Sequence, residues 1–370
     1  MRVRLAALFA LGLLTMVLVG CGRKHEPPLV VGAVDDAARY GASDAMARAW
    51  NAGFRAVVVS AVWKPPRETL APKDLAGLQQ AVAAATDTGV RPIVAVYQFS
   101  GSTPLTSTAR QQFAQYAASI PRLLPQVRDV IVGNEPNLNL FWMPQFRRDG
   151  SDAAAPAYLE LLAETYDAIK VGNPDVNVIG AGLAPRGGDD PHASRQTHSP
   201  TRFIEDLGAA YRASGRTKPV MDMFSIHPYP ENAHIPPTFT HPHTTSIGIG
   251  DYAKLVRLVD AAFGGSLPIV YGEYGVETTT PSSQRSLSQT REPTATVSEG
   301  AQARTYAQAV RIAACQPRVR MLLFFHITDE PELSGLQTGV YYANGTPKES
   351  QRVVAVEADR VASGRISCSK

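Results

Sequence analysis

Eight short apolar runs rich in β-branched residues recur along the chain of 370 residues, and amphipathic segments lie between them. Strands that are apolar throughout are typical of a parallel sheet whose outer face is covered by helices. Eight strand–helix units predict an α/β fold, a closed (β/α)8 TIM barrel in a single domain. The runs are Leu29–Ala33, Ala56–Val62, Pro92–Tyr97, Asp129–Val132, Val176–Ala181, Met221–His227, Pro268–Tyr271 and Val319–His326.

Helix start and stop signals mark several of the intervening segments. Ser43 is expected to cap a helix that stops at Gly53, and Pro72 to open one that is closed by Gly89. We expect further helices over Tyr158–Lys170, Tyr252–Phe263 and Glu299–Cys315, and a last one opened by Pro347.

The loops between these segments differ in length according to the end of the strand to which they are attached. Links from helix to strand are short, whereas the longest links from strand to helix are 184–200, 228–248 and 276–298. Long loops at the carboxyl ends of strands are typical of the rim that carries a barrel's active site. An open doubly wound sheet is the alternative, but no glycine-rich phosphate loop follows the first strand.

The first 28 residues have the pattern of an export signal followed by a tether. Arg2 and Arg4 precede an apolar run, and Leu18-Val19-Gly20-Cys21 resembles a bacterial lipoprotein signal cleaved before a lipidated cysteine. We therefore expect a signal peptide over 1–20, a short tether over 21–28 and the catalytic domain over 29–370. A plain secretory leader is the alternative. The lipoprotein interpretation predicts a membrane anchor at the cell surface or in the periplasm.

The remaining features of the whole sequence mainly argue against particular partners and cofactors. If Cys21 takes the lipid, Cys315 and Cys368 remain in an oxidising compartment, where a disulfide is expected. The formal net charge of +3, without a Lys/Arg run interleaved with aromatics, argues against a nucleic-acid partner. No cysteine or histidine spacing fits zinc, so we expect neither a metal nor another cofactor. We also expect a monomer.

Two glutamates end two of the apolar runs in the same way. Val130-Ile131-Val132-Gly133-Asn134-Glu135 and Ile269-Val270-Tyr271-Gly272-Glu273 each pass through glycine into the acid. In a parallel barrel both carboxylates would lie on one rim. Two carboxyl groups that face one cleft are the minimum equipment for cleaving a glycosidic bond.

The stretch Gly133-Asn134-Glu135-Pro136-Asn137, with Phe141-Trp142 soon after, resembles clan A of the glycoside hydrolases and is most similar to family 39. The resemblance implies the (β/α)8 fold, Glu135 as acid/base, Asn134 as a ligand of the sugar 2-hydroxyl and Glu273 as nucleophile. An acid/base needs a raised pKa and a nucleophile must stay ionised, so we expect the raised pKa on Glu135.

Other residues at the ends of strands are candidates for binding the sugar. Ser225-Ile226-His227-Pro228-Tyr229 is similar to the clan's strand 6 region, where a tyrosine supports the nucleophile. Phe325 or His326 stands where the clan commonly has a tryptophan, so the resemblance does not imply which sugar is bound. The expected substrate-binding residues are Asn134, His227, Tyr229, Trp142, Trp63, Tyr97, Gln98 and His326.

The sequence thus predicts a retaining glycoside hydrolase that acts on an oligo- or polysaccharide outside the cytoplasm, with a β linkage implied by resemblance alone. A transglycosylase with the same two glutamates and a non-catalytic carbohydrate-binding lipoprotein are the alternatives. Rival catalytic carboxylates follow the first and last strands: Asp35, Asp36, Asp329, Glu330 and Glu332.

Overall fold

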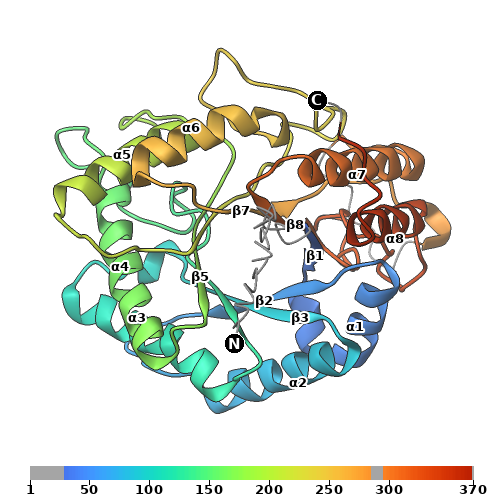
Figure 1. The fold of residues 1–370 in the computed structure, drawn as a ribbon, viewed down its shortest axis with the longest axis horizontal. Helices are drawn as coiled ribbons and strands as arrows, with labels where there is room; N and C mark the ends of the chain where they lie inside the picture. Colours follow the sequence, from blue (N-terminus) through green and yellow to red (C-terminus); the bar gives the residue numbers. More distant parts are fainter. Residues whose placement is uncertain (1–28, 285–294, 369–370) are drawn as a thin grey trace, which may run out of the picture.

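A computed structural model of the chain describes residues 29–284 and 295–368. Eight parallel strands close into a barrel in chain order, with β8 hydrogen-bonded to β1, and the helices form a ring outside it (Figure 1). The predicted (β/α)8 barrel is therefore confirmed. The strands are β1 (Val30–Val34), β2 (Ala56–Val62), β3 (Arg91–Tyr97), β4 (Asp129–Val132), β5 (Asn177–Leu183), β6 (Met223–Ile226), β7 (Ile269–Tyr274) and β8 (Val319–Phe325).

One α-helix follows each strand, and four 3-10 turns lie in the loops. The helix expected from Ser43 begins at Ala42 with Gly41 as its cap, and α3 and α5 are additions to the helical segments expected from the sequence. The helices are α1 (Ala42–Asn51), α2 (Pro72–Thr88), α3 (Ser107–Leu123), α4 (Ala154–Gly172), α5 (Pro200–Ala213), α6 (Tyr252–Phe263), α7 (Glu299–Ala314) and α8 (Glu349–Ala362), with η1 (Asp36–Arg39), η2 (Ser100–Ser102), η3 (Ile249–Asp251) and η4 (Ser282–Gln284).

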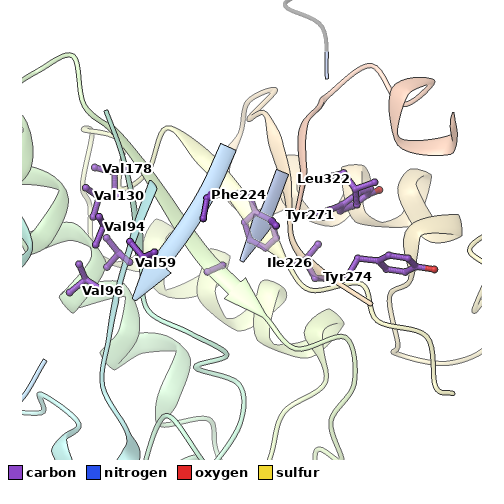
Figure 2. Close-up of a cluster of buried hydrophobic side chains, with 14 of the residues drawn as sticks. Val59, Val94, Val96, Val130, Val178, Phe224, Ile226, Tyr271, Tyr274 and Leu322 are labelled. Atoms are coloured by element: carbon purple, nitrogen blue, oxygen red, sulfur yellow. The ribbon is translucent and has the colours of Figure 1, made fainter. Parts of the chain in front are cut away.

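The apolar core has two layers, one inside the barrel and one between the barrel and the helices. Side chains alternate along a strand, so that Val58 faces the interior while Val57 and Val59 pack against helices. Figure 2 shows part of the outer layer, including Val94 and Val130. Burial on both faces explains why the strands are apolar throughout.

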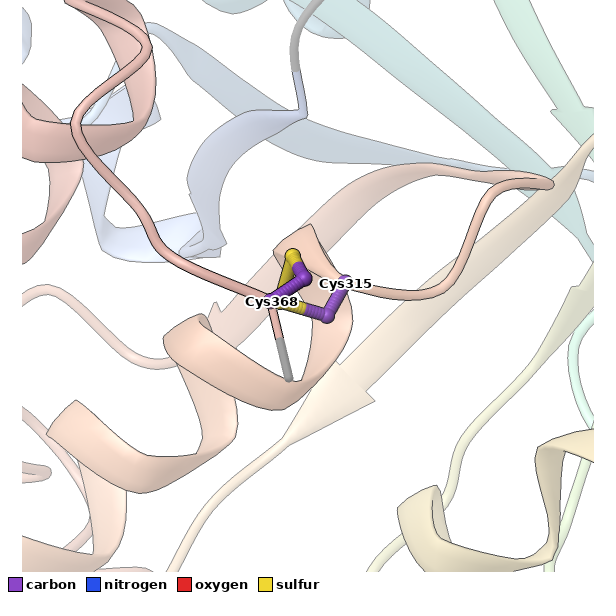
Figure 3. The surroundings of a disulfide bond; sticks show 2 residues. All are labelled: Cys315 and Cys368. Atoms are coloured by element: carbon purple, nitrogen blue, oxygen red, sulfur yellow. A yellow bond between two sulfur atoms is a disulfide. The ribbon is translucent and has the colours of Figure 1, made fainter. Parts of the chain in front are cut away.

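The predicted disulfide is confirmed. Cys315 caps the C-terminus of α7 and is bonded to Cys368 in the segment after α8, 53 residues further along the chain (Figure 3). The bond therefore fixes the C-terminal tail to the helix that follows β7.

The leader and its anchor remain expectations. The signal peptide, the tether and Cys21 lie outside the described residues. In the two described stretches, no helix is both long enough and apolar enough to cross a bilayer.

Candidate active site

Glu135 is positioned by an unusual backbone path at the end of β4. Tyr158 of α4 donates its hydroxyl to the Val132 carbonyl at 2.6 Å, where the strand ends. Gly133 follows with φ +86°, and a Cβ there would lie 2.8 Å from the Tyr158 ring, so only glycine fits. The amide of Glu135 then donates to the Gly182 carbonyl of β5 at 2.9 Å, which fixes the acid at the rim.

Glu273 is placed by an irregularity near the end of β7. The register with β8 shifts between Tyr271 and Tyr274, so the strict alternation of faces is broken there. Both tyrosines pack in the layer between barrel and helices, while the Glu273 carboxylate contacts Tyr229 and His227 in the segment that follows β6.

His227, which follows β6, lies between the two carboxylates. Its Nδ1 is 3.1 Å from Glu135 Oε1 and 3.6 Å from Glu273 Oε2. Its ring occupies space that two glycines leave open. A Cβ on Gly272 would lie 3.0 Å from His227 Cδ2, and one on Gly182 would lie 3.4 Å from its Nε2.

Tyr229 completes this arrangement. Its hydroxyl donates to Glu273 Oε2 at 2.9 Å, which is the support for the nucleophile that the sequence led us to expect. The structure thus brings together Glu135, Glu273, His227 and Tyr229, which come from three strands. Asn134 lies half-buried next to Glu135 in the chain.

The electrostatics of the site differ from the expectation. Burial raises the pKa of Glu273 to about 6; the His227 charge and the Tyr229 hydrogen bond oppose this, and the Glu135 charge adds to it. The pKa of Glu273 is raised because its carboxylate leaves water to stand beside another one, whereas we expected the raised pKa on Glu135. With a pKa of about 6, Glu273 is still mainly ionised near pH 7. Burial disfavours charge on His227 as well, but the two glutamates outweigh it and raise the pKa of His227.

The prediction that Trp63 and Trp142 bind the sugar is wrong. Trp63 and Trp142 are each only 1% exposed and belong to the core. Trp63 packs against Phe113 of α3, and Trp142 packs edge-on against Tyr158 of α4. Each ring turns under its own loop toward the helices, where its apolar area is buried, so it has no face left for a sugar.

Three other expected residues lie near the rim in different roles. Gln98 is buried, and its amide donates to the Phe141 carbonyl at 3.1 Å, so it connects the loops after β3 and β4. Burial raises the pKa of the half-buried Tyr97, and the charge of Glu273 acts in the same direction. Burial lowers the pKa of His326 to about 4, which leaves its imidazole neutral near pH 7.

A cluster of three aromatic rings lies at the end of β3 and on the loops after β3 and β4, and the sequence analysis identified it only in part. The Phe99 and Phe141 rings stack with centroids 5.6 Å apart, and Tyr97 packs edge-on against both. Phe99 is 48% exposed and its neighbour Leu140 is 51% exposed. Phe99 was missed because it stands two residues beyond β3; its place in a strand-to-helix loop was the available signal.

Two of the rival catalytic carboxylates, Asp329 and Asp35, are bound to other parts of the fold and have structural roles. Asp329 forms a fully buried ion pair with Lys348 at 2.7 Å. Asp35 is buried and accepts the amides of Ile327 and Thr328, which fixes the segment after β8 to β1. Neither side chain is exposed to a substrate. Asp36 accepts the Ser60 amide at 2.6 Å.

A cavity of about 870 Å³ opens next to Glu135. Its wall is formed by the loops after β4, β5, β6, β7 and β8, and it includes Leu138, Tyr229 and Glu231. The volume is in the range of sites for small ligands. Among the described residues, no group of three His, Cys, Asp or Glu side chains is arranged to hold a metal.

Solved structures similar to this one are glycosidases. A glucosidase from Croceicoccus marinus has a TM-score of 0.63 and 15% identity, covering 90% of this chain and 66% of its own. The β-glycosidase BGL167 has a TM-score of 0.59 and 15% identity, and the match covers 90% of this chain and 88% of its own. A β-xylosidase from Caulobacter crescentus has a TM-score of 0.57 and 17% identity, and the match covers 89% of this chain and 67% of its own. The TM-scores show a shared fold, and at such low sequence identities they show the fold alone. No family model and no curated protein matches the sequence.

The raised pKa of Glu273 predicts a pH-dependent effect on stability. Its carboxyl changes from a pKa of 4.5 to about 6 on folding, so this group costs stability as pH rises from 4.5 to 6. We expect Glu273→Gln to be more stable than the wild type by about 2 kcal/mol at pH 7 and equal to it near pH 4. Urea unfolding at pH 4, 5, 6 and 7 measures this.

Tyr229→Phe is the matched variant for this experiment. It removes a hydrogen bond that lowers the pKa of Glu273, so its stability is expected to fall more steeply over the same pH range than that of the wild type. Parallel curves for the wild type and Glu273→Gln would show that Glu273 does not carry the raised pKa.

Proposed function

We propose that this protein is a retaining glycoside hydrolase of clan A, most similar to family 39. The observation that carries the proposal is that Glu135 and Glu273 both lie within reach of His227 Nδ1, at 3.1 Å and 3.6 Å. Their nearest oxygens are therefore separated by no more than the sum of these distances. Retaining enzymes hold the carboxyl groups about 5–5.5 Å apart, whereas inverting enzymes need about 6.5–9.5 Å to admit a water. Two carboxyl groups this close to one imidazole nitrogen support the narrower, retaining spacing.

The proposed reaction has two displacements. Glu273 attacks the anomeric carbon and forms a glycosyl ester, while Glu135 donates its proton to the departing glycosidic oxygen. Esterification removes the negative charge of Glu273, so Glu135, now deprotonated, no longer faces another carboxylate. Glu135 then takes a proton from water as the water attacks the same carbon and releases Glu273.

His227 and Tyr229 help to keep Glu273 ready to attack. Their charge and hydrogen bond lower its pKa against the effect of burial, so more of it is ionised near neutral pH. His227 also contacts Glu135, so a proton on His227 reduces the repulsion between the two acids before substrate arrives.

The cluster of three aromatic rings supports a carbohydrate as the substrate. Phe99 presents exposed apolar ring surface and stacks on Phe141, and Tyr97 connects the two rings to the neighbourhood of Glu273. Apolar faces of pyranose rings stack on such surfaces, and binding sites commonly combine them with a few polar groups. The similar structures named above are called a glucosidase, a β-glycosidase and a β-xylosidase, which agrees with this class of substrate.

The nucleophile can be tested by trapping. A panel of 2-deoxy-2-fluoro glycosides with good leaving groups is expected to add one glycosyl mass to the wild type, because the fluorine slows release of the ester more than its formation. Peptide mapping should locate the label on Glu273, and Glu273→Gln should take none. A label on Asp329 or Glu330 would show that the catalytic pair is wrong.

The acid/base can be tested by chemical rescue. Glu135→Ala is expected to lower kcat/KM on glycans by about 10²–10⁴-fold and to affect dinitrophenyl glycosides less, since that leaving group needs little protonation. Azide should restore part of the aryl glycosidase activity and yield a glycosyl azide of retained configuration. Neither the wild type nor Glu273→Gln should respond to azide. An inverted glycosyl azide would contradict the retaining mechanism.

We also propose that the protein acts outside the cytoplasm, anchored through a lipid on Cys21. The leader motif and the disulfide between Cys315 and Cys368 support this location, since structural disulfides persist in oxidising compartments. The full-length chain is expected in the membrane fraction of a bacterial host, and Cys21→Ala in the soluble fraction. Unchanged membrane association of the variant would contradict the anchor.

A further inference from the structure

We propose that the leaving-group side of the cleft binds a negatively charged segment of the glycan, carrying carboxylate or sulfate groups, through Arg186 and Arg195. This inference rests on the proposed function, because the leaving-group side is defined by Glu135 acting as the acid/base. The cavity of about 870 Å³ has Glu135 in its wall and does not have Glu273 there. If Glu135 protonates the departing oxygen, the sugar that departs lies in this cavity.

Arg186 is held in place at the wall. It follows β5, and its Nη1 donates to the Tyr229 carbonyl at 2.9 Å. This bond uses one donor of the guanidinium and leaves the others available to a ligand. Within the described part of the chain, no carboxylate lies within ion-pair distance of Arg186.

Arg195 comes from the same loop and also lines the cavity. Across residues 29–284 and 295–368 it makes neither an ion pair nor a side-chain hydrogen bond. Both arginines therefore line the cavity and keep unused guanidinium donors, which suits an anion that can accept two parallel hydrogen bonds.

Among the described residues, no acid of the same wall forms an ion pair with either arginine. Glu231 Oε1 is bonded to Nε2 of His241, and His241 Nδ1 lies 2.6 Å from the buried Asp251. Asp251 also accepts the His241 and Gly248 amides, so this group of three side chains is fixed at the start of α6. Glu277 has an interaction of its own as well.

The charge is thus local to the cavity and is not a property of the whole surface. The chain has 36 basic and 33 acidic residues, so its formal net charge of +3 gives no general attraction for anions. Two exposed arginines that form no ion pair among the described residues line the cavity where a departing sugar would lie. A carboxylate or sulfate on that sugar would pair with them directly.

The experiment measures binding to Glu273→Gln, which cannot turn over its ligand. The probes are uronic-acid oligosaccharides, their fully methyl-esterified forms, and sulfated and unsulfated galactan oligosaccharides. Titration calorimetry is expected to show at least one anionic form binding about tenfold more tightly than its neutral partner, and this preference should weaken as salt is raised. Adding Arg186→Gln and Arg195→Gln should reduce the preference to about one, with little change for the neutral form.

Arg352→Gln is the matched control. Arg352 is an exposed arginine of α8, outside the cavity, and its loss should leave the preference unchanged. Equal binding of both members of every pair, binding of no anionic form, or an equal effect of Arg352→Gln would overturn the proposal. Failure of the proposed function has a different signature, because the charge preference would then persist in binding while the wild type hydrolyses none of the glycans.

Discussion

The site depends on the cost of holding two carboxylates in one cleft with little water. Glu135 and Glu273 repel each other, and burial penalises the charge of Glu273. The imidazole of His227, in reach of both acids, and the hydroxyl of Tyr229 offset this cost. These interactions offset the cost only in part, and the pKa of Glu273 is still raised to about 6. The same arrangement, which costs stability, places two carboxyl groups as a two-carboxylate reaction requires.

Barrel closure is what brings these groups together, and small residues make the closure compatible with them. Glu135 and His227 follow β4 and β6, and Glu273 lies near the end of β7, so they share one rim only because all eight strands run parallel around a closed sheet. Gly182 and Gly272 leave room for the imidazole between strands. Asn137 reinforces the rim, since its side chain bonds both the amide and the carbonyl of Ala184 in the loop after β5.

The cleft has two chemically different sides. The exposed ring of Phe99 stacks on the half-buried ring of Phe141 on the loops after β3 and β4, where apolar faces of a glycan can stack. The cavity next to Glu135 carries Arg186 and Arg195 instead, while its acid Glu231 is paired with His241. A substrate that spans both sides would combine ring stacking at one end with charge pairing at the other.

The sequence by itself determined the strands, the barrel, the disulfide and the approach of Glu135 and Glu273. These follow from local signals, namely apolar runs, glycine punctuation and the rule that parallel strands end on one rim. Only the tertiary structure decided that Trp63 and Trp142 are core residues, that Phe99 is exposed and that Asp329 is paired with Lys348. Burial and pairing depend on side chains from distant parts of the chain, so no local pattern encodes them. The raised pKa of Glu273 has the same origin, because its environment is assembled from three strands.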